Sequence, residues 1–146
     1  MVRIYSRDSR SPIPLNDDVS KKMSSIKAKN TQPELIVRRA LRTAGYPGYR
    51  KYWDVEGRPD IAYPGRKIAI FINGCYWHRC PKCNLPLPKN NTEYWKNKFE
   101  RNVTRDQKKR NLLEEDGWLV IVVWECEIKH SLDNVVRSIV ASIETR

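Results

Sequence analysis

Apolar residues recur at helical spacing in the first ordered segment that the pattern predicts. This segment begins at Thr31, with Pro33 in its first turn and Glu34 at the spacing of a capping box. Apolar positions then continue at helical intervals as far as Gly45; they are Leu35, Ile36, Val37, Ala40, Leu41 and Ala44. The pattern predicts a helix that begins at Thr31 and ends before Gly45.

Two more amphipathic helices are predicted in the second half of the chain. From Thr92 to Asp116 one stripe is apolar, most other positions are polar or basic, and Gly117 supplies a stop. The apolar stripe comprises Trp95, Phe99, Val103 and Leu113. A closing helix that covers the sheet is predicted from Val135, Val136, Ile139, Val140 and Ile143.

Extended structure is predicted between these helices. Turn residues divide the segment from Tyr49 to Ile72 into short pieces, which predict three successive strands with a buried one from Lys67 to Ile72. The apolar run from Trp118 to Trp124 predicts another buried strand. The order of helix, three strands, long helix, strand and helix is that of a mixed α/β fold, with a central sheet flanked by helices.

The length of 146 residues fits one domain. Residues 1–20 show no sustained period, so we expect a flexible basic arm over residues 1–19 and a single domain over residues 20–146. The first 15 residues contain no apolar core of a signal peptide, and the longest apolar run is too short for a bilayer span of about 20 residues. We therefore expect a cytoplasmic protein with no membrane partner, and thiols that are reduced.

Charge changes this picture of a plain α/β domain. The chain carries 28 Lys and Arg against 17 Asp and Glu, a formal net charge of +11, while 40% of its residues are hydrophobic. The apolar content favours a folded core, and the charge favours an extended polyanion as partner. Basic residues concentrate at 96–110, where they form either a solvated helix face or a phosphate-binding face; the net charge favours the latter.

The four cysteines are the strongest chemical signal. Cys80 and Cys83 form a knuckle, Cys75 follows one buried strand, and Cys126 follows the other, so two adjacent strand ends would bring all four together. Four thiolates bind Zn²⁺ in a closed structural site, which would also pin the long loop at 73–91. The alternatives are four unrelated thiols, or a redox pair made by the knuckle alone.

Four other side chains are candidates for chemistry, each with a simpler reading. Asp60, after Pro59, is either a Mg²⁺ ligand near a sheet end or a turn acceptor. His78, which the zinc set does not need, is either a general base, since imidazole titrates near neutral pH, or a solvated side chain. Glu34 is either a helix-capping residue or a catalytic one, and Asp106 is either the partner of an arginine in an ion pair or a catalytic residue. The spacing alone does not favour one role over the other.

Tyr76 and Trp77 are neighbours that would point opposite ways in an extended segment. They are either apolar plugs for the loop or wedges that enter a stack of bases.

Several short motifs in consistent order resemble the very-short-patch repair (Vsr) endonucleases. They are the segments 20–23 and 31–34, then Gly57-Arg58-Pro59-Asp60, Asn73-Gly74-Cys75-Tyr76-Trp77-His78, Asn102-Val103-Thr104-Arg105-Asp106, Gly117-Trp118 and Trp124-Glu125-Cys126. Together they cover roughly residues 20–128, and motifs in register are far more specific than any one alone.

The resemblance implies a restriction-endonuclease-like (PD-(D/E)XK-type) core with a structural zinc. It implies Mg²⁺-dependent nicking of duplex DNA on the 5′ side of the thymine in T:G mismatches, leaving a 5′-phosphate. By position, Asp60 and the main-chain carbonyl of Ile72 would bind Mg²⁺ and His78 would be the general base. Glu34 and Asp106 would complete the acidic surround, through water on the metal or by orienting the imidazole.

The resemblance also implies how DNA is held. Tyr76 and Trp77 would wedge into the stack beside the mismatch, and Met23 would enter from the opposite side. The positive charge of the long helix, and not the resemblance, favours phosphate contacts by a set of its basic residues: Lys96, Lys98, Arg101 and Arg105. We expect a monomer associated with the nucleoid of a prokaryotic cell, with a functional link to a cytosine-5 DNA methyltransferase and to mismatch-repair proteins.

Two positions depart from the family pattern, and two other functions stay open. Asn73 stands where the best-known member has a second histidine, and Cys80 takes the place of a zinc ligand that is commonly histidine. The same fold could serve a restriction or defence endonuclease with a different DNA specificity. A zinc-stabilised DNA-binding module without catalysis is the other alternative.

Overall fold

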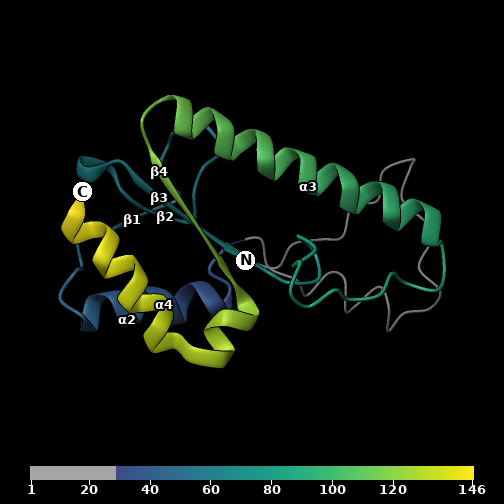
Figure 1. The fold of residues 1–146 in the computed structure, drawn as a ribbon, viewed down its shortest axis with the longest axis horizontal. Helices are drawn as coiled ribbons and strands as arrows, with labels where there is room; N and C mark the ends of the chain where they lie inside the picture. Colours follow the sequence, from purple (N-terminus) through teal and green to yellow (C-terminus); the bar gives the residue numbers. More distant parts are fainter. Residues whose placement is uncertain (1–28) are drawn as a thin grey trace.

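The computed structural model describes residues 29–146, and Figure 1 shows their arrangement. The predicted arm at 1–19 and Met23 lie outside the described residues. The elements in chain order are α2 (Gln32–Thr43), β1 (Arg50–Lys51), β2 (Ile61–Tyr63), the short 3₁₀ turn η1 (Pro64–Arg66), β3 (Ile68–Asn73), α3 (Thr92–Glu115), β4 (Leu119–Trp124) and α4 (Glu125–Thr145). This order confirms the predicted sequence of helices and strands.

The four strands form one mixed sheet in the order β1-β2-β3-β4. The first two pairings are antiparallel, whereas β3 and β4 run parallel, with Asn73 paired to Trp124 at their ends. The carboxyl ends of β3 and β4 are therefore neighbours. That juxtaposition places the loop after β3 beside the start of α4.

The helices cover both faces of the sheet (Figure 1). α2 and α4 pack on one face, where the larger core contains Val37, Leu41, Ile70, Ile139 and Ile143. α3 lies on the other face over a smaller core, formed by Ala62, Ala69, Leu113 and Trp118. The result is a mixed α/β architecture in three layers. No helix among residues 29–146 is long and apolar enough to cross a bilayer.

The start of α2 has the predicted capping box. The Glu34 N–H donates to the Thr31 hydroxyl at 3.5 Å, and the Thr31 N–H donates to Glu34 Oε2 at 3.2 Å. Leu35, assigned above to the apolar stripe, is 38% exposed. It lies about half a helical turn from the buried Val37, because successive residues are roughly 100° apart.

The structure corrects the expected burial of α3 and β4. Phe99 and Leu113 are buried as predicted, but Val103 is 44% exposed. In β4 only Val123 is buried, although a buried strand was expected. Val103 and Val122 line a pocket between the helix and the sheet, and β4 is the edge strand of the described sheet, so no further strand covers its outer side.

The last helix begins earlier than its apolar pattern indicated. α4 starts at Glu125, directly after β4, and is interrupted at Ser131, whose φ of −157° is not helical. The Ser131 hydroxyl accepts the N–H of Asn134 at 3.3 Å and so caps the second part. The amphipathic pattern at 135–143 belongs to that second part, whereas the first part carries Cys126.

Candidate active site

The four cysteines meet where β3 and β4 end. Their sulfur atoms all lie within 4.8 Å of one another. The Sγ atoms of Cys80 and Cys126 are 3.7 Å apart, and the Cys126 N–H points to Cys75 Sγ at 3.3 Å. The parallel pairing of the strands brings Cys75 and Cys126 together, and the knuckle closes over them because the Cys80 N–H donates to the Cys75 carbonyl at 2.9 Å.

This geometry fits a tetrahedral metal. Zn–S bonds of about 2.3 Å place the sulfurs of such a site roughly 3.8 Å apart. The cysteines are all free thiols, and two of them, Cys75 and Cys80, are buried. They therefore form one cluster that could hold a metal ion, and the interpretation as four unrelated thiols is wrong.

His78 lies on the same loop and pairs with a carboxylate from α3. The His78 Nδ1 is 2.6 Å from Asp106 Oδ2, and since a carboxylate only accepts, Nδ1 carries the proton. Nε2 is then the atom that can accept a proton. The partner of Asp106 is this histidine, so the expected ion pair with an arginine is corrected.

The aromatic residues before His78 also pack on α3. The rings of Tyr76 and Phe99 are 5.3 Å apart, those of Trp77 and Trp95 are 6.1 Å apart, and Tyr76 and Trp77 contact each other edge to face. They do not point in opposite directions, because residues 75–79 form turns rather than an extended strand. Both side chains stay partly exposed, so a plug and a wedge are compatible roles.

A pocket of about 350 Å³ opens beside the His78–Asp106 pair. Its walls come from α3, the cysteine loop and the α3 side of the sheet, and they include Phe71, Val103 and Val122. Asn73, only 8% exposed, also lines it. Basic side chains complete the lining: Arg79, Lys109 and Arg110. The pocket thus combines an apolar floor with positive charge next to the histidine.

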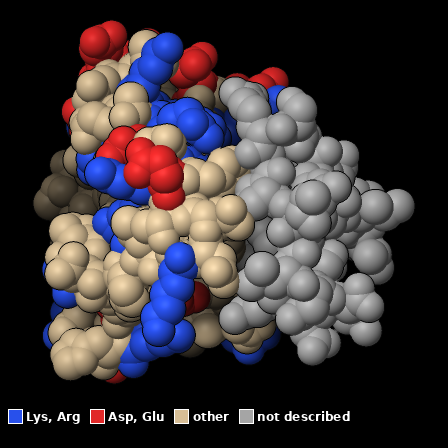
Figure 2. Space-filling view, turned by 90° about the vertical axis from the view of Figure 1, so that its right-hand side faces the viewer, with Lys and Arg blue, Asp and Glu red and all other residues tan. Residues whose placement is uncertain are grey.

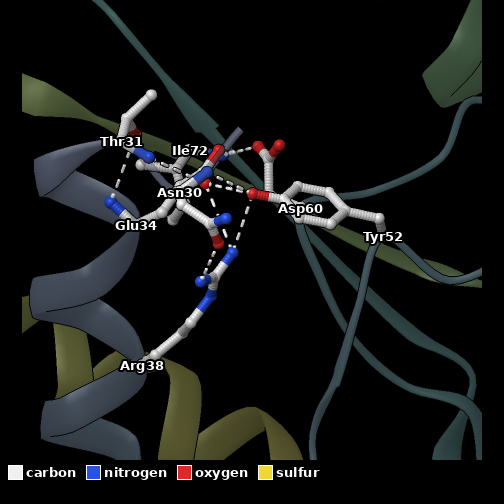
Figure 3. A network of polar contacts seen from close by, with 7 residues as sticks. All are labelled: Asn30, Thr31, Glu34, Arg38, Tyr52, Asp60 and Ile72. Carbon is white, nitrogen blue, oxygen red and sulfur yellow. Dashed lines mark hydrogen bonds and ion pairs between the residues drawn. The ribbon is translucent and has the colours of Figure 1, made fainter. Parts of the chain in front are cut away.

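Asp60 lies directly before β2, in the network that Figure 3 shows. Its Oδ2 accepts the N–H of Ile72 at 2.7 Å, which ties the side chain to the end of β3. Burial raises the pKa of Asp60 to about 7; the Ile72 N–H opposes this rise, and the nearby Glu34 carboxylate adds to it. A divalent cation bound between these oxygens would neutralise the two carboxylates, so the donor set fits Mg²⁺.

Glu34 is 2% exposed and does more than cap α2. Its Oε2 accepts hydrogen bonds from the Tyr52 hydroxyl at 2.6 Å and from Arg38 Nη2 at 3.3 Å. Neither partner was predicted from the sequence. Arg38 is four residues from Glu34 on a helix, a spacing that could have been noticed. Tyr52 comes from a loop, with no signal in the sequence.

The structure brings the four candidate catalytic residues into one region. Asp60 and Glu34 neighbour each other at the end of β3, and His78, which contacts Asp106, lies on the loop that leaves this same end. Sheet topology produces this arrangement, since Asp60 is fixed to the end of β3 and His78 follows that same end in the chain.

The basic residues predicted to contact phosphates lie along α3. Lys96, Arg101 and Arg105 are exposed, while Lys98 is half-buried with its Nζ 5.4 Å from the centre of the Trp95 ring. Figure 2 shows Lys and Arg spread over the described part of one face, with Asp and Glu mainly in its upper half. The exposed positions are free to meet a polyanion.

Comparison with known proteins gives a consistent result. The family model described as DNA mismatch endonuclease Vsr matches residues 15–85. The chain is 42% identical to the type II nicking enzyme V.XorIIP of Xanthomonas oryzae pv. oryzae, over 73% of this chain and 78% of that protein. It is 38% identical to the type II nicking enzyme V.NaeI of Lentzea aerocolonigenes, over 90% and 80%. It is 33% identical to the DNA mismatch endonuclease Vsr of Escherichia coli K12, over 75% and 70%.

Proposed function

Because this chain belongs to the Vsr family of DNA mismatch endonucleases, we propose that it nicks duplex DNA 5′ of the thymine in T:G mismatches and uses Mg²⁺. Membership makes the chain a DNA endonuclease, so the binding module without catalysis is set aside. The names of its relatives as nicking enzymes support cleavage of one strand. We further propose that the mixed sheet is a restriction-endonuclease-like core, and that residues 20–146 form one domain after the arm.

The observation that carries this proposal is that two acidic side chains lie at the end of β3, from which the loop with the histidine–carboxylate pair starts. Asp60 and Glu34 form the acidic side, and His78 with Asp106 forms the basic side. Hydrolysis of a phosphodiester needs a group that takes a proton from water and positive charge against the phosphate oxygens. A protein that only binds DNA needs neither arrangement.

The chain's own residues divide this work. His78 Nε2 would take the proton of the attacking water, while Asp106 keeps the proton on Nδ1 and holds the ring in place. Asp60 and the carbonyl of Ile72 would hold Mg²⁺, and Glu34 would complete the acidic surround. The ion would supply charge stabilisation for the pentacoordinate transition state. Departure of the 3′ oxygen would leave a 5′-phosphate.

The remaining parts of the proposal concern zinc and DNA. Cys75, Cys80, Cys83 and Cys126 would bind Zn²⁺ and fix the loop that presents His78. Tyr76 and Trp77 would wedge beside the mismatch, with Met23 opposite, and the basic residues of α3 would contact phosphates. A wobble pair costs less to unstack than a matched pair, so the wedge itself would favour mismatches. A monomer fits one-strand cleavage. We also propose that it acts at the nucleoid, with a functional link to a cytosine-5 DNA methyltransferase and to mismatch-repair proteins.

A cleavage panel tests the proposal. Duplexes with each mismatch, and a perfectly paired duplex, are incubated with Mg²⁺ and resolved on denaturing gels. We expect one nick on the 5′ side of the mismatched thymine, and a loss on the order of 10³-fold for Asp60→Asn with DNA binding retained. Asp54→Asn, an exposed carboxylate of the same loop, is the matched control. Equal cutting of paired DNA would favour the restriction or defence enzyme instead.

A further inference from the structure

A buried arginine lies within the acidic side of the site, and the proposed chemistry does not use it. Arg38 is 5% exposed, and its Nε is buried without a hydrogen-bond partner among residues 29–146. Burying a guanidinium with an unpaired N–H is costly, so its place beside Glu34 needs a reason. Figure 3 shows Arg38, Asn30 and Tyr52 gathered around the Glu34 carboxylate.

The Tyr52 hydroxyl joins the members of this network. It donates to Glu34 Oε2 at 2.6 Å and accepts from Arg38 Nη2 at 2.9 Å and from the Asn30 N–H at 2.5 Å. One donor and two acceptor positions are all that a phenolic hydroxyl offers, so its capacity is fully used. The Tyr52 N–H also reaches the Asp60 carbonyl at 3.3 Å. One residue thus ties the Glu34 side chain to the backbone of Asp60.

The backbone of Tyr52 adopts a left-handed conformation to make these contacts, with φ of +49°. Such a conformation costs free energy in a residue other than glycine and persists only where surrounding contacts enforce it. The Arg38 guanidinium lies 5.3 Å from the centre of the Tyr52 ring, and its Nη1 donates to Asn30 Oδ1 at 2.8 Å. The network is therefore held from several directions.

All of these donors converge on one oxygen of Glu34. Oε2 receives the Thr31 N–H, the Tyr52 hydroxyl and Arg38 Nη2. None of these three donors goes to Oε1, and the same carboxylate lies within hydrogen-bond reach of the Asp60 side chain. The charges would also balance once a cation keeps both carboxylates ionised: Glu34 and Asp60 would then carry two negative charges and Arg38 one positive, so a divalent cation and one phosphate diester would bring the cluster to neutrality.

We infer that Tyr52 and Arg38 are positioning residues, which hold Glu34 by Oε2 and so keep its carboxylate beside Asp60 for the bound cation and its water. This inference rests on the proposed function of the Asp60 site and adds residues to it. Partners of this kind, one step removed from a metal, typically change metal affinity or activity by roughly 10- to 100-fold.

The test uses Tyr52→Phe, which removes the hydroxyl and keeps the ring. We expect the Mg²⁺ concentration for half-maximal nicking to rise about tenfold, with DNA affinity in the absence of Mg²⁺ unchanged. Binding of Mn²⁺ alone, followed by the loss of the free-ion electron paramagnetic resonance signal, should weaken by a similar factor. That second readout needs no cleavage, so it tests the inference even if the proposed T:G nicking fails.

The chain supplies a matched control one helical turn further along α2. There Arg42 Nη2 donates to the Tyr49 hydroxyl at 2.8 Å, with its guanidinium over the ring at 6.0 Å, and neither residue contacts Glu34 in the structure. Tyr49→Phe should leave both the Mg²⁺ requirement and Mn²⁺ binding within twofold of the wild type. Equal behaviour of Tyr52→Phe and Tyr49→Phe would overturn the inference.

Two further variants cover the case in which Tyr52→Phe does not fold. Arg38→Lys keeps the charge but loses the forked contact to Asn30 and Tyr52, and should weaken Mn²⁺ binding by about tenfold. In a Glu34→Gln background, Tyr52→Phe should add less than twofold, because the tyrosine acts through Glu34. Wild-type Mn²⁺ binding in Arg38→Lys, or additive losses in the double variant, would each refute the positioning role.

Discussion

The two halves of the candidate active site are held in different ways. The carboxylate half, Asp60 and Glu34 with their partners Arg38 and Tyr52, is fixed by buried hydrogen bonds between α2, a loop and the end of β3. The histidine half, His78 with Asp106, is more open, with side chains 34% and 24% exposed. Its loop is shaped by the cysteine cluster and by aromatic packing on α3.

This difference suits two tasks. A site that binds a cation gains from a low dielectric and from carboxylates that do not reorient. A group that takes a proton from water has to reach solvent and the DNA backbone. Substitutions in the two halves should therefore have independent effects. Loss of a cysteine or of the histidine should leave cation binding intact, and loss of a carboxylate should leave the histidine loop folded.

The largest effect is expected from Cys126→Ser. Loss of one ligand should abolish tight zinc binding and unfold the loop at 74–91, lowering the free energy of unfolding by at least ~3 kcal/mol and stopping cleavage. The carboxylate half should survive, with Mn²⁺ binding within threefold of the wild type. Metal analysis, thermal unfolding and limited proteolysis of the loop provide the measurements.

Removal of zinc from the wild type with a chelator serves as the control for Cys126→Ser and should reproduce its proteolysis pattern. A folded, active wild-type protein that contains no zinc would contradict the structural role of the cluster. Loss of Mn²⁺ binding together with zinc would show that the two halves are not independent.

The second expected effect is confined to the histidine half. His78→Ala should lower the nicking rate at saturating DNA by 10²- to 10⁴-fold, on the order of what general bases contribute, and leave DNA and Mn²⁺ binding unchanged. Asp106→Asn should cost less, about tenfold to a hundredfold, because it disturbs only the tautomer and orientation of the ring.

The exposed His130 on α4 offers the control for this prediction, since His130→Ala should nick at the wild-type rate. The pH dependence of the rate separates the roles. If His78→Ala retained the wild-type pH profile at a similar rate, another group would be the base, and the assignment of His78 would be wrong.

Local periodicity and spacing predicted most of the fold and the cysteine cluster that shapes the loop of the histidine half. The capping box at Thr31, the stop at Gly117 and the cysteine spacing are features of neighbouring residues, and the structure confirms each. Asp60 and His78 were predicted as candidate site residues because each belongs to a short sequence motif. Their placement at the same end of β3 depends on the hydrogen bond from the Ile72 N–H to Asp60, and the meeting of Cys75 with Cys126 depends on the parallel pairing of β3 with β4; no local pattern specifies either contact.

The failures have a common physical origin. An apolar stripe predicts which side of a helix faces inward, but not whether a neighbour fills the space. Val103 faces a pocket and stays exposed for that reason. The Tyr52 hydroxyl contacts Glu34 because the backbone of Tyr52 is left-handed, and a tyrosine in the sequence does not predict that conformation. Contacts between loops and helices are tertiary, so a sequence pattern does not reveal them.

The smallest predicted effect separates the halves by pH. The pKa of Asp60 is raised from 3.8 to about 7, first by burial, so between these values the folded chain binds more protons than the unfolded chain. The stability that Asp60 contributes is therefore complete below about pH 4 and is lost as the pH rises through 7. Asp60→Asn, which keeps an oxygen for the Ile72 N–H, should gain on the order of 2 kcal/mol relative to the wild type between pH 5 and pH 8 without Mg²⁺.

Urea unfolding of the wild type and of Asp60→Asn at the two pH values measures this gain. The difference between the two proteins removes the contributions of all other titrating groups, which they share. Asp54→Asn alters an exposed carboxylate and should run parallel to the wild type. Mg²⁺ at pH 8 should restore stability to the wild type and not to Asp60→Asn, because only the former has two carboxylates to neutralise. If Asp60→Asn also ran parallel to the wild type, the carboxylate half would be hydrated rather than buried, and the contrast between the two halves would not hold.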